Sequence, residues 1–203
     1  MVWRYPRIMG QMGNLEIDLN YMYRQPLWPV VDKKPQLPFV TALDIPVLDI
    51  HELAAGKLSA LFSRQASRDF FDAHYLLVKQ PLNIDQLRLA FTIYLSMTNI
   101  DLDNLTPEKI DFNITDIRNR LLPVLRQKEM SRKPAALKTW ASGLQSELKE
   151  RLAILFPLTP EQREFVLRVR TSGNIAPELI TQDKALSDNI SNHPAIAWAA
   201  RKL

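Results

Sequence analysis

The sequence predicts an α+β fold in which a small N-terminal β-sheet precedes a helical bundle. Strand-like alternation of apolar and polar residues is confined to residues 1–49. From residue 50 onward the apolar residues recur with the period of an α-helix. Strands followed by helices, without alternation between the two, are typical of the α+β class. We therefore expect a sheet region at 1–49 and a helical domain at 50–203.

Two N-terminal segments, 2–9 and 15–22, have the pattern of strands. They flank Gly-Gln-Met-Gly-Asn, whose glycines predict a hairpin turn. In the second segment apolar and polar residues alternate, so Glu16 and Asp18 share one face. The proline-rich stretch that follows, RQPLWPVVDKKPQLPF, predicts a surface loop because proline cannot donate a ladder hydrogen bond. Residues 39–43 and 46–48 are two further strand candidates.

The helical part has seven predicted helices, at 50–63, 68–79, 84–98, 113–127, 134–155, 160–171 and 193–201. Thr159-Pro160 predicts the start of the sixth helix, because proline is favoured at the first helical position. Gly173-Asn174 predicts its end, and Ser67 is a candidate N-cap for the second helix.

Composition indicates a globular domain, with 46% apolar and 24% charged residues in a chain of 203. The 26 Lys and Arg against 22 Asp and Glu suit a nucleotide or nucleic-acid partner, although simple solubility explains the same excess. The absence of cysteine excludes disulfides and thiolate zinc sites, and the three histidines are scattered. No membrane segment or signal peptide is apparent, so we expect a cytoplasmic protein.

Lys57 falls near the centre of an apolar helical stripe that includes Leu53, Ala54, Leu58 and Leu61. A lysine in this position either extends past its neighbours to water or faces a pocket that holds anionic groups. The residues alone leave both alternatives open.

Asp69 and Asp72 lie on one face of a helix whose other residues are almost all apolar. Buried acids need partners, and Lys57, Arg64 or Arg68 could serve. Asp69 is also explained by its place in the first helical turn, where the helix dipole favours a carboxylate.

Glu16 and Asp18 admit two interpretations. They either form the exposed polar face of a half-buried strand or bind a metal ion at the end of a sheet, since Mg²⁺ prefers oxygen ligands.

The string HELAAGKLSALFSRQASRDFFDAHYLL resembles the signature of the AbiEii/AbiGii toxin family of nucleotidyltransferases. The matching positions, in order, are Glu52, Ala55, Lys57, Ala60, Leu61, Arg64, Arg68, Asp69 and Asp72. Gly56 departs from the pattern, because the family more often has Ala-Glu before the lysine. The segments LEIDLNY, LTPEQREFVLRV, SGNIAPELI and HPAIAWAARKL also resemble family segments.

The resemblance implies an enzyme that transfers a nucleotide from a nucleoside triphosphate to RNA, typically the 3′ end of a tRNA. Asp18, with Glu16 beside it, would bind Mg²⁺ on the triphosphate. Lys57 would offset phosphate charge, Asp72 or, as second choice, Asp69 would orient it, and Arg64 and Arg68 would help to bind the nucleotide. A bacterial toxin–antitoxin or abortive-infection role and a cognate antitoxin are implied as well.

The family's first motif, a Gly-Ser followed by two acids, should precede Asp18 by many tens of residues. The 17 residues before Asp18 contain no Gly-Ser and only one acid, Glu16. We therefore expect the C-terminal two-thirds of such an enzyme, inactive by itself. Two alternatives stay open, namely a non-enzymatic module that binds RNA or a protein, and a structural network of charges with no ligand.

Overall fold

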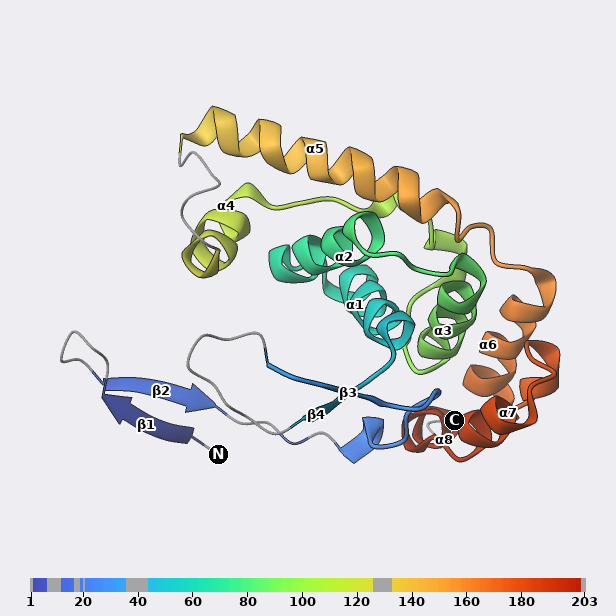
Figure 1. Cartoon of the computed structure of the whole chain (residues 1–203). Coiled ribbons are helices and arrows are strands. Elements are labelled where there is room, and N and C mark those ends of the chain that lie inside the picture. Colours follow the sequence, from blue (N-terminus) through green and yellow to red (C-terminus); the bar gives the residue numbers. More distant parts are fainter. Residues whose placement is uncertain are drawn as a thin grey trace.

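The α+β prediction is confirmed: two small antiparallel sheets near the N-terminus precede a helical body (Figure 1). The computed structural model describes residues 2–6, 12–16, 19, 21–35, 44–125 and 133–201. The division of the chain at residue 49 stays a prediction.

The first sheet is a hairpin of β1 (Val2–Pro6) and β2 (Met12–Glu16), with Val2 opposite Glu16 and Pro6 opposite Met12. The expected pairing is present, but β2 begins within the predicted turn sequence. The second strand also does not reach Tyr21, which begins a 3-10 turn, η1 (Tyr21–Tyr23). This turn packs against α8, so tertiary contacts override the alternating pattern there.

The second sheet pairs β3 (Val31–Lys33) with β4 (Ile45–Val47) in antiparallel register. β3 lies inside the stretch that we predicted as a surface loop, so three residues of that stretch form a short strand instead. They sit between Pro29 and Pro35, and this proline-free run leaves enough N–H donors for a short ladder. β4 overlaps the predicted strand at 46–48, whereas the predicted strand at 39–43 lies outside the described residues.

Six of the seven predicted helices are present as single α-helices. They are α1 (Ile50–Arg64), α2 (Ser67–Lys79), α3 (Ile84–Ser96), α5 (Pro134–Ala153), α6 (Pro160–Ser172) and α8 (Pro194–Ala200). Short 3-10 turns, η2 (Leu102–Asn104), η3 (Pro107–Lys109) and η7 (Pro177–Leu179), connect them. Sequence analysis missed α7 (Lys184–Ser191), which is too short for a clear period and buries only Leu186 and Ile190.

The predicted helix at 113–127 is broken into three pieces. α4 (Ile114–Asp116) passes into the π-helical η4 (Ile117–Leu121) and the 3-10 turn η5 (Leu122–Val124). Pro123 explains the break, because proline has no N–H to donate and its ring clashes with the preceding helical turn.

The caps of the helices agree with the sequence in two cases of three. Thr159 and Gln162 form a capping box at the start of α6, and Gly173 ends that helix with a positive φ of 68°. Ser67 is not the N-cap of α2, because Ala66 occupies that position. Instead, the backbone N–H of Ser67 donates to Oδ2 of Asp116 at 2.8 Å. The side chain of an acid from a distant segment therefore caps the N-terminus of α2.

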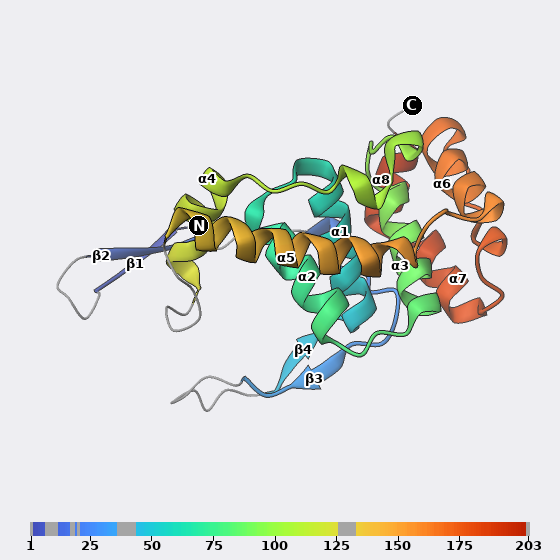
Figure 2. The same ribbon diagram turned by 90° about the horizontal axis from the view of Figure 1, so that it is seen from above.

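The core lies where α1 packs against both α2 and α3, with α5 along α2 (Figures 1 and 2). Leu58, Leu61, Phe70, Phe91 and Leu95 are fully buried there. The β1–β2 hairpin stands apart from the helices in Figure 1. Among the described residues, no helix is long and apolar enough to cross a bilayer.

Candidate functional site

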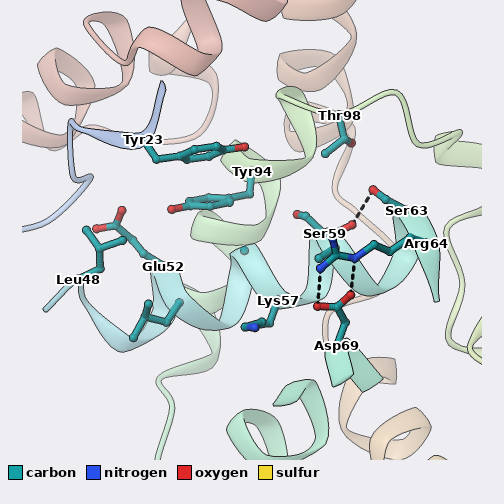
Figure 3. Close-up of a pocket in the computed structure, with 13 residues that line it drawn as sticks. Tyr23, Leu48, Glu52, Lys57, Ser59, Ser63, Arg64, Asp69, Tyr94 and Thr98 are labelled. Carbon is teal, nitrogen blue, oxygen red and sulfur yellow. Dashed lines mark hydrogen bonds and ion pairs between the residues drawn. The ribbon is translucent and has the colours of Figure 1, made fainter. Parts of the chain in front are cut away.

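A cavity of about 450 Å³ runs along α1 and is closed by parts of α2, α3 and η1 (Figure 3). The residues on its walls are Tyr23, Leu48, Glu52, Leu53, Gly56, Lys57, Ser59, Ala60, Ser63, Arg64, Asp69, Tyr94 and Thr98. Three of the predicted site residues, Lys57, Arg64 and Asp69, therefore share one cavity.

Lys57 pairs with Asp72 across the α1–α2 interface, with Nζ 2.7 Å from Oδ2. The expected partnership is present, but neither side chain is buried: they are 44% and 40% exposed. The buried face of α1 instead centres on Ala55 and Leu58, since α3 packs there, and Leu53 is exposed. Lys57 consequently lies at the edge of that face, on the cavity wall, and Asp72 lies outside the cavity.

Asp69 is the buried acid of the pair on α2, at 2% exposed. Arg64 donates to both of its carboxylate oxygens, from Nε at 2.5 Å and from Nη2 at 2.9 Å. This bidentate arrangement is the geometry in which arginine binds carboxylates most strongly. The hydrogen bonds and the charge of Asp69 raise the pKa of Arg64. Asp69 thus has the kind of partner that the sequence required.

The other predicted site residues are not in the cavity. Arg68 donates from Nε to the backbone carbonyl of Arg120 at 3.3 Å and does not line the walls. Asp18 lies outside the described residues, and Glu16 is described only as the last residue of β2, without its side chain. The metal-binding role of Glu16 and Asp18 therefore stays a prediction.

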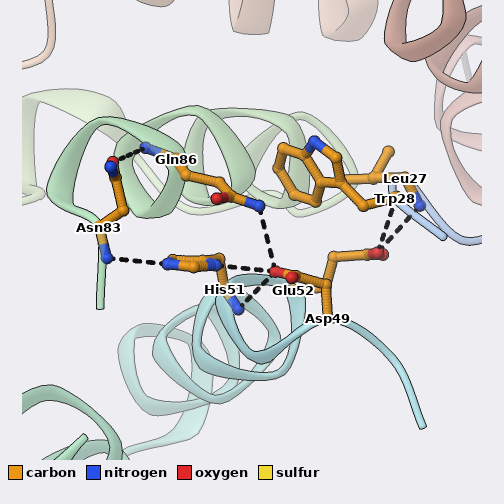
Figure 4. Close-up of polar contacts among 7 residues, drawn as sticks. All are labelled: Leu27, Trp28, Asp49, His51, Glu52, Asn83 and Gln86. Carbon is orange, nitrogen blue, oxygen red and sulfur yellow. Dashed lines mark hydrogen bonds and ion pairs between the residues drawn. The ribbon is translucent and has the colours of Figure 1, made fainter. Parts of the chain in front are cut away.

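Glu52 is a buried acid in the first turn of α1 that residue-by-residue reasoning did not single out. Its Oε1 accepts hydrogen bonds from the backbone N–H groups of Leu27 and Trp28, at 3.0 and 3.1 Å (Figure 4). Burial raises the pKa of Glu52, and these two bonds oppose the shift. The carboxylate, which lines the cavity, thereby fixes the proline-rich segment to the start of α1.

Two stacked tyrosines form the wall opposite α1 (Figure 3). The rings of Tyr23 and Tyr94 have centroids 5.9 Å apart and planes inclined by 24°. Tyr94 also lies against Gly56, where a Cβ would come within 3.3 Å of the ring carbon Cε1. In the sequence, this contact is indicated only by Gly56 itself, which stands where the family more often has a larger residue. Burial, followed by the charge of Glu52, raises the pKa of Tyr94.

A polar network at the start of α1 holds the helix against α3 (Figure 4). The backbone N–H of Asn83 donates to Nε2 of His51 at 2.9 Å. The proton of the neutral ring is therefore on Nδ1, which donates to Asp49 at 2.8 Å. Asp49 also accepts from the backbone N–H of His51 and so caps α1. This arrangement orients the helix that carries Lys57.

A family model described as "Nucleotidyl transferase AbiEii toxin, Type IV TA system" matches residues 1–166. The chain belongs to this family. The match includes all of α1 and α2 and ends within α6, so it covers most of LTPEQREFVLRV, whereas SGNIAPELI and HPAIAWAARKL lie beyond it. AbiEii proteins are thus nucleotidyl transferase toxins of a toxin–antitoxin system, which implies an antitoxin partner. No curated protein and no solved structure matches the chain.

Proposed function

We propose that this chain binds a nucleoside triphosphate in the α1–α3 cavity with Lys57 against the phosphates, and that it serves the transfer of a nucleotide to RNA such as a tRNA. The observation that carries the proposal is the position of Lys57. Lys57 lines the cavity in a member of a nucleotidyl transferase family, and its ammonium pairs with a half-exposed acid.

The pairing with Asp72 leaves Lys57 able to bind phosphate. An exposed ion pair contributes only about 0–1 kcal/mol, so a triphosphate with several negative charges can compete for the lysine. An ammonium also has three N–H donors, so it can donate to a phosphate oxygen and to Asp72 together. Asp72 then positions Lys57 at the rim of the cavity.

The Arg64–Asp69 pair has a different role from Lys57. Asp69 is buried and neutralises Arg64 through two hydrogen bonds, so this pair adds little net charge to the cavity. It joins the C-terminal end of α1 to the start of α2 and so shapes the wall beside Lys57. Lys57 differs because its partner Asp72 is exposed, so Lys57 is the cation of the two for which a phosphate can compete.

Magnesium enters the proposal only through the family. Among the described residues, no three His, Cys, Asp or Glu side chains lie close enough together to hold a metal ion. We expect the 203-residue polypeptide to bind nucleotide without transferring it.

A second candidate function is a module that binds RNA or a partner protein. The β1–β2 hairpin favours protein binding, because Val2, Trp3, Tyr5 and Met12 are all exposed on it. By the register of the hairpin, Trp3 and Tyr5 share one face, and exposed aromatic side chains on one face are typical of an interaction surface. An antitoxin is a candidate partner for this hairpin.

Calorimetric titration with ATP, GTP, CTP and UTP tests the binding proposal. Lys57→Ala should weaken nucleotide binding by about ten- to hundredfold, the value of a hydrogen bond to a charged group. Lys79→Ala is the matched control, since Lys79 is an exposed lysine on α2 that does not line the cavity and lies 3.9 Å from Glu147. Equal affinities of wild type and Lys57→Ala would refute the proposal.

Incubation of the chain with labelled nucleotides, total tRNA and Mg²⁺ tests whether the chain transfers a nucleotide to RNA. We expect no label on the RNA. Robust labelling would show that the chain completes a catalytic site by itself.

A further inference from the structure

Ser59 places a buried hydroxyl with no partner on the cavity wall. The residue is 6% exposed, and its Oγ has no hydrogen-bond partner within the described part of the chain. Buried hydroxyls are normally paired, because leaving one unpaired is costly. An unpaired hydroxyl that lines a cavity therefore indicates a ligand group as its partner.

Two other hydroxyls on nearby helices are satisfied by their own backbone. Ser63, one turn further along α1, donates to the carbonyl of Ser59 at 2.7 Å, and Thr92 on α3 donates to the carbonyl of Arg88 at 2.9 Å. This bond to the preceding turn is the usual one for a hydroxyl inside a helix. Ser59 does not make it (Figure 3).

The two sides of the cavity differ in charge. Lys57 lies on the side of α1 that faces α2. Glu52 and Tyr94 line the side toward α3, where Glu52 accepts two backbone N–H bonds as a carboxylate would. A buried carboxylate repels phosphate, so phosphates are favoured on the Lys57 side and the neutral nucleoside on the tyrosine side.

We propose that Ser59 hydrogen-bonds the nucleoside part of the bound nucleotide, at a sugar hydroxyl or a base edge, and so sets which nucleotide is accepted. The assignment rests on the proposed function, and it adds a specificity residue to the phosphate contact of Lys57. Ser59 lies on α1 two residues after Lys57, so one helix would position both parts of the ligand.

Titrations of Ser59→Ala test this assignment with two kinds of probe, the four nucleoside triphosphates and inorganic triphosphate. Loss of one neutral hydrogen bond should weaken binding of at least one nucleotide about three- to tenfold, with no change for inorganic triphosphate. Ser172→Ala is the matched control and should change each affinity by less than about twofold, because that hydroxyl on α6 donates to the carbonyl of Arg168 at 2.9 Å and does not line the cavity. Thermal unfolding of each variant verifies that it is folded.

The outcomes separate this inference from the proposed function. If Ser59→Ala binds every nucleotide as wild type does while Lys57→Ala is impaired, the Ser59 assignment is wrong and the phosphate site stands. An equal loss for inorganic triphosphate would place Ser59 at the phosphates and overturn its nucleoside role. Absence of nucleotide binding to wild type would overturn both proposals. The titration is then repeated with 2′-deoxynucleotides. If Ser59 contacts the 2′-hydroxyl, Ser59→Ala should no longer change the affinity for these ligands. If Ser59 contacts another nucleoside group, the loss of affinity should persist.

Discussion

The Nζ atom of Lys57 and the Oδ2 atom of Asp72 lie 2.7 Å apart and join α1 to α2 at the rim of the cavity. Both side chains remain accessible to water, so the pair is screened and holds the helices together only weakly. A lysine in such a pair is available to a ligand at little cost to the fold.

Lys57→Ala should therefore lower the free energy of unfolding by less than about 1 kcal/mol. Denaturant titration followed by circular dichroism measures this value. A loss of several kcal/mol would mean that Lys57 is a structural residue, and its effect on nucleotide binding would then have to be reinterpreted.

The Arg64–Asp69 pair should respond asymmetrically to substitution. Arg64→Ala leaves the carboxylate of Asp69 buried without its partner, which should cost about 3 kcal/mol. Asp69→Asn removes the negative charge but keeps one oxygen that can accept from Arg64, and the 65% exposed guanidinium is solvated by water, so the cost should be nearer to 1 kcal/mol. The same unfolding titrations compare the two variants. The reverse order would contradict the assigned burial of this pair.

Gly56→Ala tests the contact between α1 and the stacked tyrosines. Alanine is preferred over glycine in a helix by about 1 kcal/mol, but here its Cβ would press on the buried ring of Tyr94. Gly143→Ala in α5 is the control, because nothing lies within 4 Å of its added Cβ. We expect Gly143→Ala to stabilise the protein by about 0.5–1 kcal/mol and Gly56→Ala to be neutral or destabilising. Equal gains in melting temperature would show that Tyr94 moves aside without cost.

Most of the helical part could be predicted because its signals are local. Periodicity located α1, α2 and α3 to within a few residues, and Thr159 and Gly173 marked the ends of α6. Local pattern also placed Lys57, Asp69 and Asp72 together, because the residues are few turns apart on consecutive helices.

The remaining features of the site depend on contacts between distant segments, which no local pattern records. Tyr23 reaches Tyr94 across 71 positions of the chain, and Glu52 binds backbone groups of a segment that reads as a loop. The predicted burial of Asp72 failed for the same reason. The way α2 packs on its neighbours turns Phe70 and Ala73 inward and leaves Asp72 at the surface.

His193 should make the stability of the fold depend on pH. The ring is buried against Tyr23, its Nδ1 accepts from the backbone N–H of Ala195, and burial lowers its pKa from 6.5 to about 4. Between these two values the unfolded chain binds a proton that the folded chain does not, so stability falls as the pH decreases through that window and is constant above it. The full effect approaches about 3 kcal/mol.

Unfolding titrations from pH 7 to pH 4.5 measure this effect as the difference between wild type and His193→Asn. Asparagine can cap α8 but does not titrate, so the variant should lose less stability on acidification. Parallel pH profiles of the two proteins would contradict the assignment to His193.

A crystal structure of the chain with a non-hydrolysable nucleoside triphosphate tests the central claim most directly. Our account predicts phosphate oxygens within hydrogen-bonding distance of Nζ of Lys57 and the nucleoside beside Tyr94, with Ser59 as a contact. A nucleotide bound elsewhere on the chain, with the cavity empty and Lys57 still paired to Asp72 alone, would contradict it.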